Sequence, residues 1–195
     1  HIRGRFNAEN LLLSGALLLS LGFAMEQVCT SLSDVRSIPG RMQYCGSSSG
    51  GVRVFLDYAH SPDSMMAVLS SLREYQPRSL IVVFGCGGDR DRDKRPIMCD
   101  IAETHADRVI LTSDNPRSED NVTITREIAI GMDPSRPAVV EHDRADAIEL
   151  AINEANTGDI VLVAGKGHET FQERGNTRTS FSDHAVIARI LQGGE

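Results

Sequence analysis

The sequence predicts an α/β fold, a Rossmann-like and mostly parallel sheet covered by helices on both faces. Short apolar runs of strand length, among them 80–84 and 160–164, alternate with segments that have helical spacing. These runs are rich in β-branched residues without polar alternation, which is typical of strands buried on both faces of a parallel sheet. Glycines follow both runs directly, so each strand is expected to end in a tight loop.

The composition is that of an ordinary globular protein, and it argues against nucleic acid and anionic membranes as partners. The 195 residues are 41% hydrophobic and 24% charged, with a formal net charge of -7. An acidic chain does not attract nucleic acid or an anionic membrane through its overall charge, and a chain without Trp offers a poor stacking platform for bases. Its four cysteines are scattered without a Cys-x-x-Cys pair, which favours reduced thiols in a cytoplasmic protein over disulfides or a zinc site.

The most apolar stretch, residues 11–24, is expected to be a buried helix that is capped at Asn7 and ends near Gly22. It is shorter than the ~18 to 20 apolar residues that a membrane span needs. The basic residues before it resemble a secretory signal, so a secreted protein with oxidised cysteines is an alternative. Residues 26–38 are less periodic, and Pro39-Gly40-Arg41 is expected to form a turn or hinge at a domain boundary.

Beyond this hinge, two strands joined by a turn rich in Gly and Ser are expected first. The second strand leads into a helix that Ser61 or Asp63 would cap. After that helix, strands and helices alternate to the end of the chain. The expected strands are 43–45, 52–57, 80–84, 109–112, 138–141 and 160–164, and the expected helices are 64–75, 97–104, 123–132, 144–156 and a last one that is capped within 181–183 and runs to 191.

Polar residues follow several of the expected strands, and a parallel sheet would bring them to one edge. Ligands of such sheets gather at the carboxyl ends of the strands. The loops at those ends carry His60, 85–95, 114–117 and 165–169. We therefore expect these residues to converge on one site, although they are far apart in the sequence.

Three familiar kinds of site are excluded by the residues in these loops. Arg90 stands where a dinucleotide-binding fingerprint beginning at Gly85 would have its third glycine. Lys166 is followed by Gly167 rather than by Ser or Thr, which excludes a Walker phosphate loop. The six histidines do not fall at metal-ligand spacing, and no nucleophile with an adjacent base is visible.

The charged residues that remain suit a zwitterionic amino acid. Arg90 and Arg117 offer planar, bidentate donors for a carboxylate. Asp114, Glu169 and the amide oxygen of Asn115 offer acceptors for an ammonium group. The alternative for residues 114–117 is a plain turn, because Asp, Asn and Pro all favour turns.

The ordered motifs of these loops resemble the Mur ligase family over nearly the whole chain. The motifs are Leu56-Asp57-Tyr58-Ala59-His60-Ser61-Pro62-Asp63, Phe84-Gly85-Cys86-Gly87-Gly88-Asp89-Arg90-Asp91 with Lys94-Arg95-Pro96, Asp114-Asn115-Pro116-Arg117, and Ala164-Gly165-Lys166-Gly167-His168-Glu169. Pro39-Gly40-Arg41 and Gly4-Arg5-Phe6-Asn7 with Asn10 are also similar to that family. Asp-Asn-Pro-Arg in particular resembles the signature of members that take meso-diaminopimelate rather than lysine.

The resemblance implies an ATP-dependent acid–amino-acid ligase of peptidoglycan synthesis. In such an enzyme ATP phosphorylates the side-chain carboxylate of D-glutamate in UDP-N-acetylmuramoyl-L-alanyl-D-glutamate, and an amine of meso-diaminopimelate attacks the acyl phosphate. The implied contacts to meso-diaminopimelate are Arg90, Asp114, Asn115, Arg117, Gly165 and Glu169. The implied contacts to ATP are Asn7, Arg41 and His60.

The same resemblance implies that the chain is the C-terminal part of a longer ligase. Residues 1–38 would be the tail of the central ATP-binding domain, and residues 39–195 would be the complete amino-acid-binding domain. The phosphate loop, the Mg²⁺ ligands and the UDP-sugar domain would precede residue 1. ATP and Mg²⁺ would then be held mainly by upstream domains, and the chain alone would not catalyse ligation.

Two alternatives of different kinds stay open. A sister ligase that adds lysine or glutamate has the same fold, but Arg117 in the Asp-Asn-Pro-Arg loop disfavours it. A noncatalytic module that senses an amino acid or a cell-wall precursor is the second alternative. A phosphate loop in the upstream coding sequence would favour the ligase, and its absence from the whole gene product would favour the binding module.

Overall fold

A six-stranded sheet forms the centre of the molecule in a computed structural model that describes residues 4–193. Its strands are β1 (Gln43–Ser47), β2 (Arg53–Asp57), β3 (Leu80–Phe84), β4 (Arg108–Leu111), β5 (Val139–Val140) and β6 (Ile160–Ala164). Their order in the sheet is β1-β2-β6-β3-β4-β5, with β1 antiparallel to β2 and every other neighbouring pair parallel. The predicted, mostly parallel sheet is therefore confirmed.

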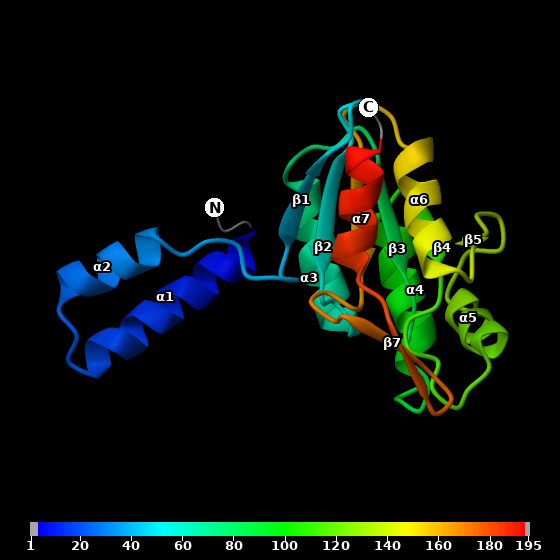
Figure 1. The fold of residues 1–195 in the computed structure, drawn as a ribbon, viewed down its shortest axis with the longest axis horizontal. Helices are drawn as coiled ribbons and strands as arrows, with labels where there is room; N and C mark the ends of the chain where they lie inside the picture. Colours follow the sequence, from blue (N-terminus) through cyan, green and yellow to red (C-terminus); the bar gives the residue numbers. More distant parts are fainter. Residues whose placement is uncertain (1–3, 194–195) are drawn as a thin grey trace.

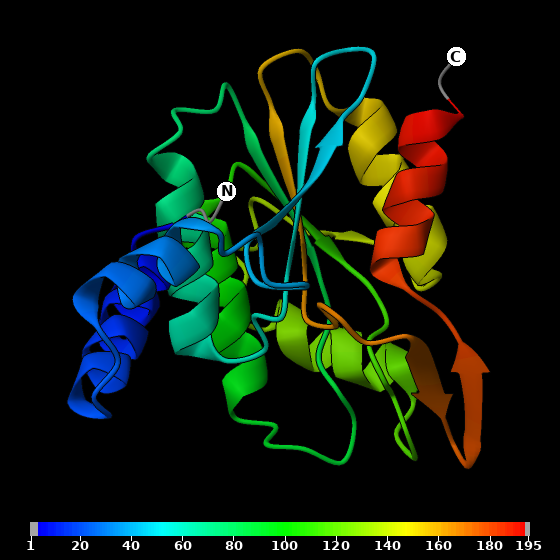
Figure 2. The ribbon, with the colours of Figure 1, turned by 60° about the vertical axis from the view of Figure 1, so that its left-hand side comes forward.

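Helices cover both faces of this sheet (Figures 1 and 2). One face packs against α3 (Pro62–Arg73), α4 (Lys94–His105) and α5 (Asn121–Ala129). The other face packs against α6 (Arg144–Glu154) and α7 (Asp183–Gln192). The central strands β3 and β6 are buried at every position, which explains why their sequences are apolar without alternation.

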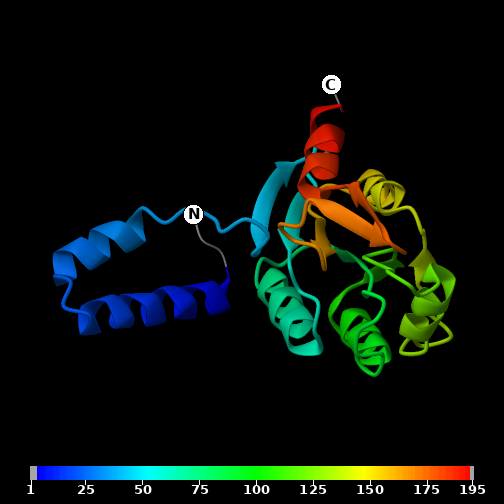
Figure 3. The same ribbon diagram turned by 60° about the horizontal axis from the view of Figure 1, so that its bottom comes forward.

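The first two helices form a hairpin that projects away from the sheet (Figures 1 and 3). They are α1 (Arg5–Ser20) and α2 (Met25–Ser33), and the second was not predicted. The expectation of a buried first helix is wrong, because Leu12 and Leu13 are 73% and 72% exposed. Asn7 is not its cap either, since Gly4 occupies the N-cap and Asn7 lies in the first turn with its side chain buried. A run of leucines predicts a helix, but it does not show whether another segment of the same chain covers it.

A second, two-stranded sheet after β6 was also not predicted. It consists of β7 (Phe171–Arg174) and β8 (Thr177–Ser180), which pair in antiparallel fashion. Their residues are mostly polar and none is fully buried, so the usual apolar signal of a strand is missing. The turn pair Gly175-Asn176 between them was the available signal.

The predicted caps at two later helices are confirmed. Ser61 accepts a hydrogen bond from the backbone N–H of Ser64 at the start of α3, and Ser182 accepts one from Ala185 at the start of α7. All four cysteines are unpaired. Among residues 4–193, no helix combines the length and the apolar character that crossing a bilayer requires.

Candidate functional site

A pocket of about 410 Å³ opens beside the carboxyl ends of β2, β3, β4 and β6. Parallel strands bring their following loops together there, as the alternating sequence led us to expect. The predicted site residues that line this pocket are His60, Arg90, Asp114, Asn115, Arg117, Gly165 and Glu169. The structure thus brings these residues together, while their roles stay predictions.

Lys166 joins two of the predicted residues at the buried end of the pocket. Its side chain is fully buried, and its Nζ donates to Oδ1 of Asn115 at 2.9 Å and to Oε2 of Glu169 at 2.8 Å. The Nδ2 of Asn115 also donates to Oε2 of Glu169, at 2.9 Å. The three side chains therefore hold one another in a closed ring of hydrogen bonds. Lys166 had no assigned role in the sequence, although a lysine between two glycines directly after a buried strand was the available signal.

The amide oxygen of Asn115 is not open to a ligand, which corrects the expectation that it would accept a hydrogen bond from an ammonium group. It already accepts from Lys166 Nζ and from the backbone N–H of Glu173 at 3.0 Å. An amide oxygen accepts at its lone pairs, and both are used here. Asn115 therefore orients Glu169, whose Oε1 is left for a ligand.

Asp114 offers the acceptor that Asn115 does not. Its carboxylate receives no hydrogen bond from the described residues and lies against Gly165, where a Cβ would come within 2.7 Å of Oδ2. Gly165 has a φ of +113°, which favours glycine, and the absence of a Cβ also lets the Asp114 carboxylate lie close to its backbone. Burial raises the pKa of Asp114, and the positive charges of Arg144 and Lys166 oppose that rise. A buried carboxylate without a hydrogen bond is a strong acceptor for a cationic ligand group.

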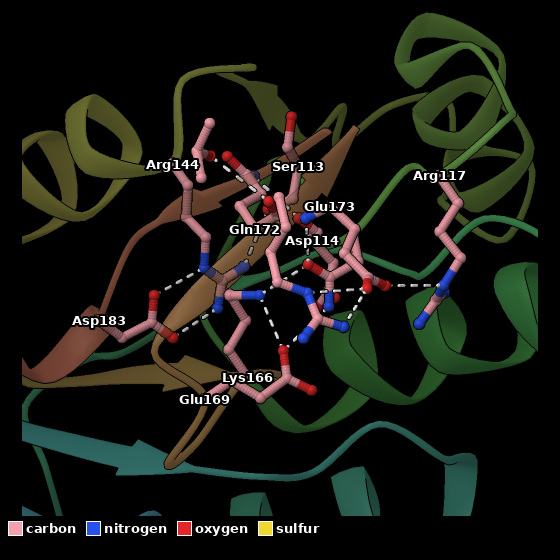
Figure 4. A network of polar contacts seen from close by, with 12 residues as sticks. Ser113, Asp114, Arg117, Arg144, Lys166, Glu169, Gln172, Glu173 and Asp183 are labelled. Atoms are coloured by element: carbon pink, nitrogen blue, oxygen red, sulfur yellow. Dashed lines mark hydrogen bonds and ion pairs between the residues drawn. The ribbon is translucent and has the colours of Figure 1, made fainter. Parts of the chain in front are cut away.

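Arg117 is held in place by the unpredicted β7–β8 hairpin. Its backbone N–H donates to the carbonyl of Glu173 at 3.1 Å, and its Nε lies 3.3 Å from Oε2 of the same residue. Its Nη1 donates to the carbonyl of Gly88 at 2.8 Å. The Nη2 of this guanidinium stays available for a carboxylate. Figure 4 shows Arg117 and Glu173 in this contact, close to Asp114.

Arg90 lies at the exposed rim of the pocket. Its Nη1 contacts the carbonyl of Asp89 at 3.3 Å, so the side chain is only loosely held. The loop that carries Arg90 is anchored by Glu119, because the backbone N–H of Asp89 donates to Oε1 of Glu119 at 2.6 Å. Glu119 in turn binds the fully buried guanidinium of Arg95.

A second exposed group of basic residues gathers around the ring of Tyr58. The guanidinium of Arg41 lies 4.9 Å from the centre of that ring, and the rings of His60 and His168 lie 4.6 and 5.3 Å from it. Of the residues expected to contact ATP, the structure therefore brings Arg41 and His60 together. Asn7 lies in α1 and is not part of the pocket lining.

Within residues 4–193, no group of three or more His, Cys, Asp and Glu side chains is placed to hold a metal ion. The described part of the chain therefore does not fit a Mg²⁺ site built from such a cluster.

Comparison with known proteins gives consistent matches. A family model described as the Mur ligase, glutamate ligase domain matches residues 40–167. The UDP-N-acetylmuramoyl-L-alanyl-D-glutamate--2,6-diaminopimelate ligase of Xanthomonas oryzae pv. oryzae is 47% identical over 188 residues, which are 96% of this chain and 38% of that protein. The ligase of the same name from Chromobacterium violaceum is 47% identical over 190 residues, again 96% of this chain and 38% of that protein.

Solved structures show the same relationship. A UDP-N-acetylmuramoyl-L-alanyl-D-glutamate--2,6-diaminopimelate ligase superposes with a TM-score of 0.77 at 38% identity and covers 98% of this chain and 39% of its own. A folylpolyglutamate synthase of Mycobacterium tuberculosis, complexed with ADP and AMPPCP, shares the fold at 23% identity and a TM-score of 0.69, over 84% of this chain and 38% of its own. The chain spans about 38% of the length of the curated relatives it matches.

Proposed function

This chain belongs to the Mur ligase family, and we propose that it is the amino-acid-binding part of an ATP-dependent ligase of peptidoglycan synthesis. The complete enzyme would add meso-diaminopimelate to UDP-N-acetylmuramoyl-L-alanyl-D-glutamate through an acyl phosphate. One observation carries the proposal. A single pocket contains carboxylate oxygens of Asp114 and Glu169 that accept no hydrogen bond from the described residues, and it also contains the guanidinium groups of Arg90 and Arg117. The names of the relatives support the same substrates.

The charge pattern of the pocket suits meso-diaminopimelate better than lysine. Diaminopimelate carries two ammonium and two carboxylate groups, whereas lysine carries only one carboxylate. Asp114 and Oε1 of Glu169 would accept from ammonium, and Arg90 and Arg117 would each bind a carboxylate. Lysine would leave one of these guanidinium groups without a ligand carboxylate, which disfavours it. In this proposal Asn115 holds Glu169, and Gly165 makes room for Asp114.

The cluster around Tyr58 is proposed to contact ATP at its phosphates. Arg41 and His60 are exposed, and positive charge placed beside a transferring phosphoryl group stabilises the transition state. Asn7 is proposed as a further nucleotide contact on the separate helical hairpin. Mg²⁺ and most ATP contacts are proposed to lie in the part of the relatives that this chain does not match.

The contrast between the helical hairpin and the sheet supports the proposed domain division. Residues 1–38 are assigned to the ATP-binding domain and residues 39–195 to the amino-acid-binding domain. Leu12, Leu13 and Leu17 on α1 are all at least 60% exposed, and an apolar surface of this kind is normally covered by protein. The chain alone would then be inactive in ligation, and the complete enzyme would work in the cytoplasm, where ATP is available.

Calorimetric titration of the chain with meso-diaminopimelate, and with L-lysine as a control ligand, tests this function. Replacing Arg117 by Ala should weaken diaminopimelate binding by about 1.5 to 3 kcal/mol, because a charge-assisted contact is lost. Arg117→Lys should also be harmful, since a point charge does not replace a planar fork. The exposed Arg36, in the connection between α2 and β1, provides the matched control Arg36→Ala, which should bind like the wild type.

Two outcomes would contradict the proposal. If Arg117→Ala bound diaminopimelate as tightly as the wild type, Arg117 would not be a ligand contact. If L-lysine bound as tightly as diaminopimelate, the pocket would not select for a second carboxylate.

A further inference from the structure

A fully buried ion pair lies beside the pocket and has no part in the contacts proposed above. Arg144 is the first residue of α6 and Asp183 is the first residue of α7. Their side chains are 0% exposed and meet in two parallel contacts, from Nε to Oδ1 at 2.7 Å and from Nη2 to Oδ2 at 2.8 Å. Figure 4 shows Asp183 holding the guanidinium of Arg144 on the side away from Arg117.

The same guanidinium also reaches the two loops that form the buried end of the pocket. Its Nη1 donates to the carbonyl of Ser113 at 3.1 Å, and its Nη2 donates to the carbonyl of Ala164 at 2.9 Å. Ser113 directly precedes Asp114, and Ala164 directly precedes Gly165. One side chain therefore contacts the starting point of both loops.

These two loops are not neighbours in the sheet. Ser113 follows β4 and Ala164 ends β6, whereas β3 lies between those strands. Ladder hydrogen bonds therefore do not connect the two loop origins directly. Arg144 does so across the end of β3, with its own position fixed by Asp183.

If the Arg144–Asp183 ion pair served only the stability of the fold, its hydrogen bonds to the two loop carbonyls would not be needed. A buried ion pair can often be replaced by apolar residues without loss of stability. The carbonyls of Ser113 and Ala164 are different, because they receive directed hydrogen bonds that an apolar side chain would not supply. A planar guanidinium binds several acceptors in fixed directions, which an ammonium group does not.

We propose that Arg144, held by Asp183, is a positioning residue of the amino-acid pocket and, together with the hydrogen bonds that Asn115 makes with Lys166 and Glu169, fixes the loops 113–117 and 164–169 relative to each other. The identity of the ligand rests on the proposed function, but the geometric role does not. Arg144 also supplies positive charge to Asp114, which faces Lys166 and Glu169 from the loop after β6 and Asp183 from α7. Its charge and its shape therefore act on the same pocket.

Hydrogen exchange on the chain in the absence of ligand tests the geometric role with Arg144→Lys. This variant keeps the positive charge but loses the fork. Exchange of the backbone amides of Arg117 and Glu173 should speed up by about tenfold, because their hydrogen bonds, to the carbonyl of Glu173 and to Oδ1 of Asn115, join the loop 113–117 to the strand that follows the loop 164–169. Exchange in α3, which touches neither loop carbonyl, should stay as in the wild type.

Arg108→Lys is the matched control. Arg108 on β4 forms an ion pair with Glu154 on α6, so it joins the helix that carries Arg144 to a strand of the sheet without contacting either loop carbonyl. This variant should leave loop exchange unchanged. Asp183→Asn is the second variant, which removes the charge that anchors Arg144 and should speed up exchange of the same two amides. Wild-type loop exchange in both Arg144→Lys and Asp183→Asn, with each variant folded, would overturn the proposal.

Binding of meso-diaminopimelate gives an independent readout. Arg144→Lys should weaken binding about tenfold without moving its pH dependence, because the charge beside Asp114 is retained. Arg144→Met removes that charge, so the pKa of Asp114 should rise further and binding should begin at a higher pH. An equal pH profile in Lys and Met variants would overturn the electrostatic part. A wild-type chain that does not bind diaminopimelate would count against the proposed function, while the exchange result would still decide the positioning role.

Discussion

The buried end and the exposed rim of the pocket are built in different ways. At the buried end, Lys166, Asn115 and Glu169 hold one another through hydrogen bonds between 2.8 and 2.9 Å. At the rim, Arg90 contacts only the carbonyl of its neighbour, and Arg41 rests on the ring of Tyr58. Groups that are fixed before a ligand arrives need little reorganisation on binding. The contrast indicates that the buried end, where we propose that the amino acid binds, is preformed, and that the rim is less tightly fixed.

The largest expected effect comes from breaking the buried ring. Lys166→Met would leave Glu169 and Asn115 without their shared donor and should lower the free energy of unfolding by about 3 kcal/mol. Lys94→Met is the control at the rim, where Lys94 donates to the exposed carbonyl of His60. It should cost about 1 kcal/mol or less. Urea unfolding measures both, and equal losses would show that the buried end is not the more rigid one.

A smaller effect is expected where the hinge meets the buried end. Gly40 has a φ of +67°, and a Cβ there would lie 2.4 Å from the backbone nitrogen of His168. Gly22 has a φ of +90° with nothing within 4 Å of its Cβ position, so Gly22→Ala isolates the cost of the left-handed backbone. Gly40→Ala should therefore destabilise by about 2 kcal/mol more than Gly22→Ala in urea unfolding. Equal losses of stability in the two variants would mean that Gly40 is not packed tightly against the loop after β6.

The smallest effect concerns acid stability of the rim loop. Hydrogen bonds from Arg95 lower the pKa of Glu119 to about 2, and Glu119 also binds the N–H of Asp89. A lowered folded-state pKa contributes stability that is fully present above the unfolded value of about 4.3 and is lost as the pH falls through the folded one. Glu119→Gln should remove that part of the pH dependence. The free energies of unfolding of wild type and variant should differ at pH 5 and converge as the pH falls toward the folded-state pKa of Glu119. A difference that stays constant over this pH range would contradict the assignment.

Much of the fold could be predicted because its signals are local. The apolar runs of β3 and β6 are buried on both sides, so the predicted and observed bounds of these strands agree. The exposure of α1 could not be predicted, because a leucine-rich face looks the same whether this chain or another segment covers it. The β7–β8 hairpin was missed because its residues are polar and largely exposed.

The candidate site was predictable in its membership but not in its hydrogen bonding. Residues after parallel strands converge, which is a property of the topology. The oxygen of Asn115, however, is occupied by Lys166 and by the N–H of Glu173, residues more than fifty positions away. Arg144 was likewise invisible as a site residue, since its role depends on carbonyls that follow two strands separated by a third. Such contacts arise only when the tertiary structure forms.

The most direct test of a preformed amino-acid end is an NMR titration of the ¹⁵N-labelled chain with meso-diaminopimelate. The largest shift changes should fall on the side-chain amide of Asn115 and on the backbone amides of Arg117, Gly165 and Glu169. Resonances of α1 and α2 should not change. Saturable shift changes that avoid these four residues, or no shift changes at any ligand concentration, would contradict the proposal that this pocket receives the amino acid.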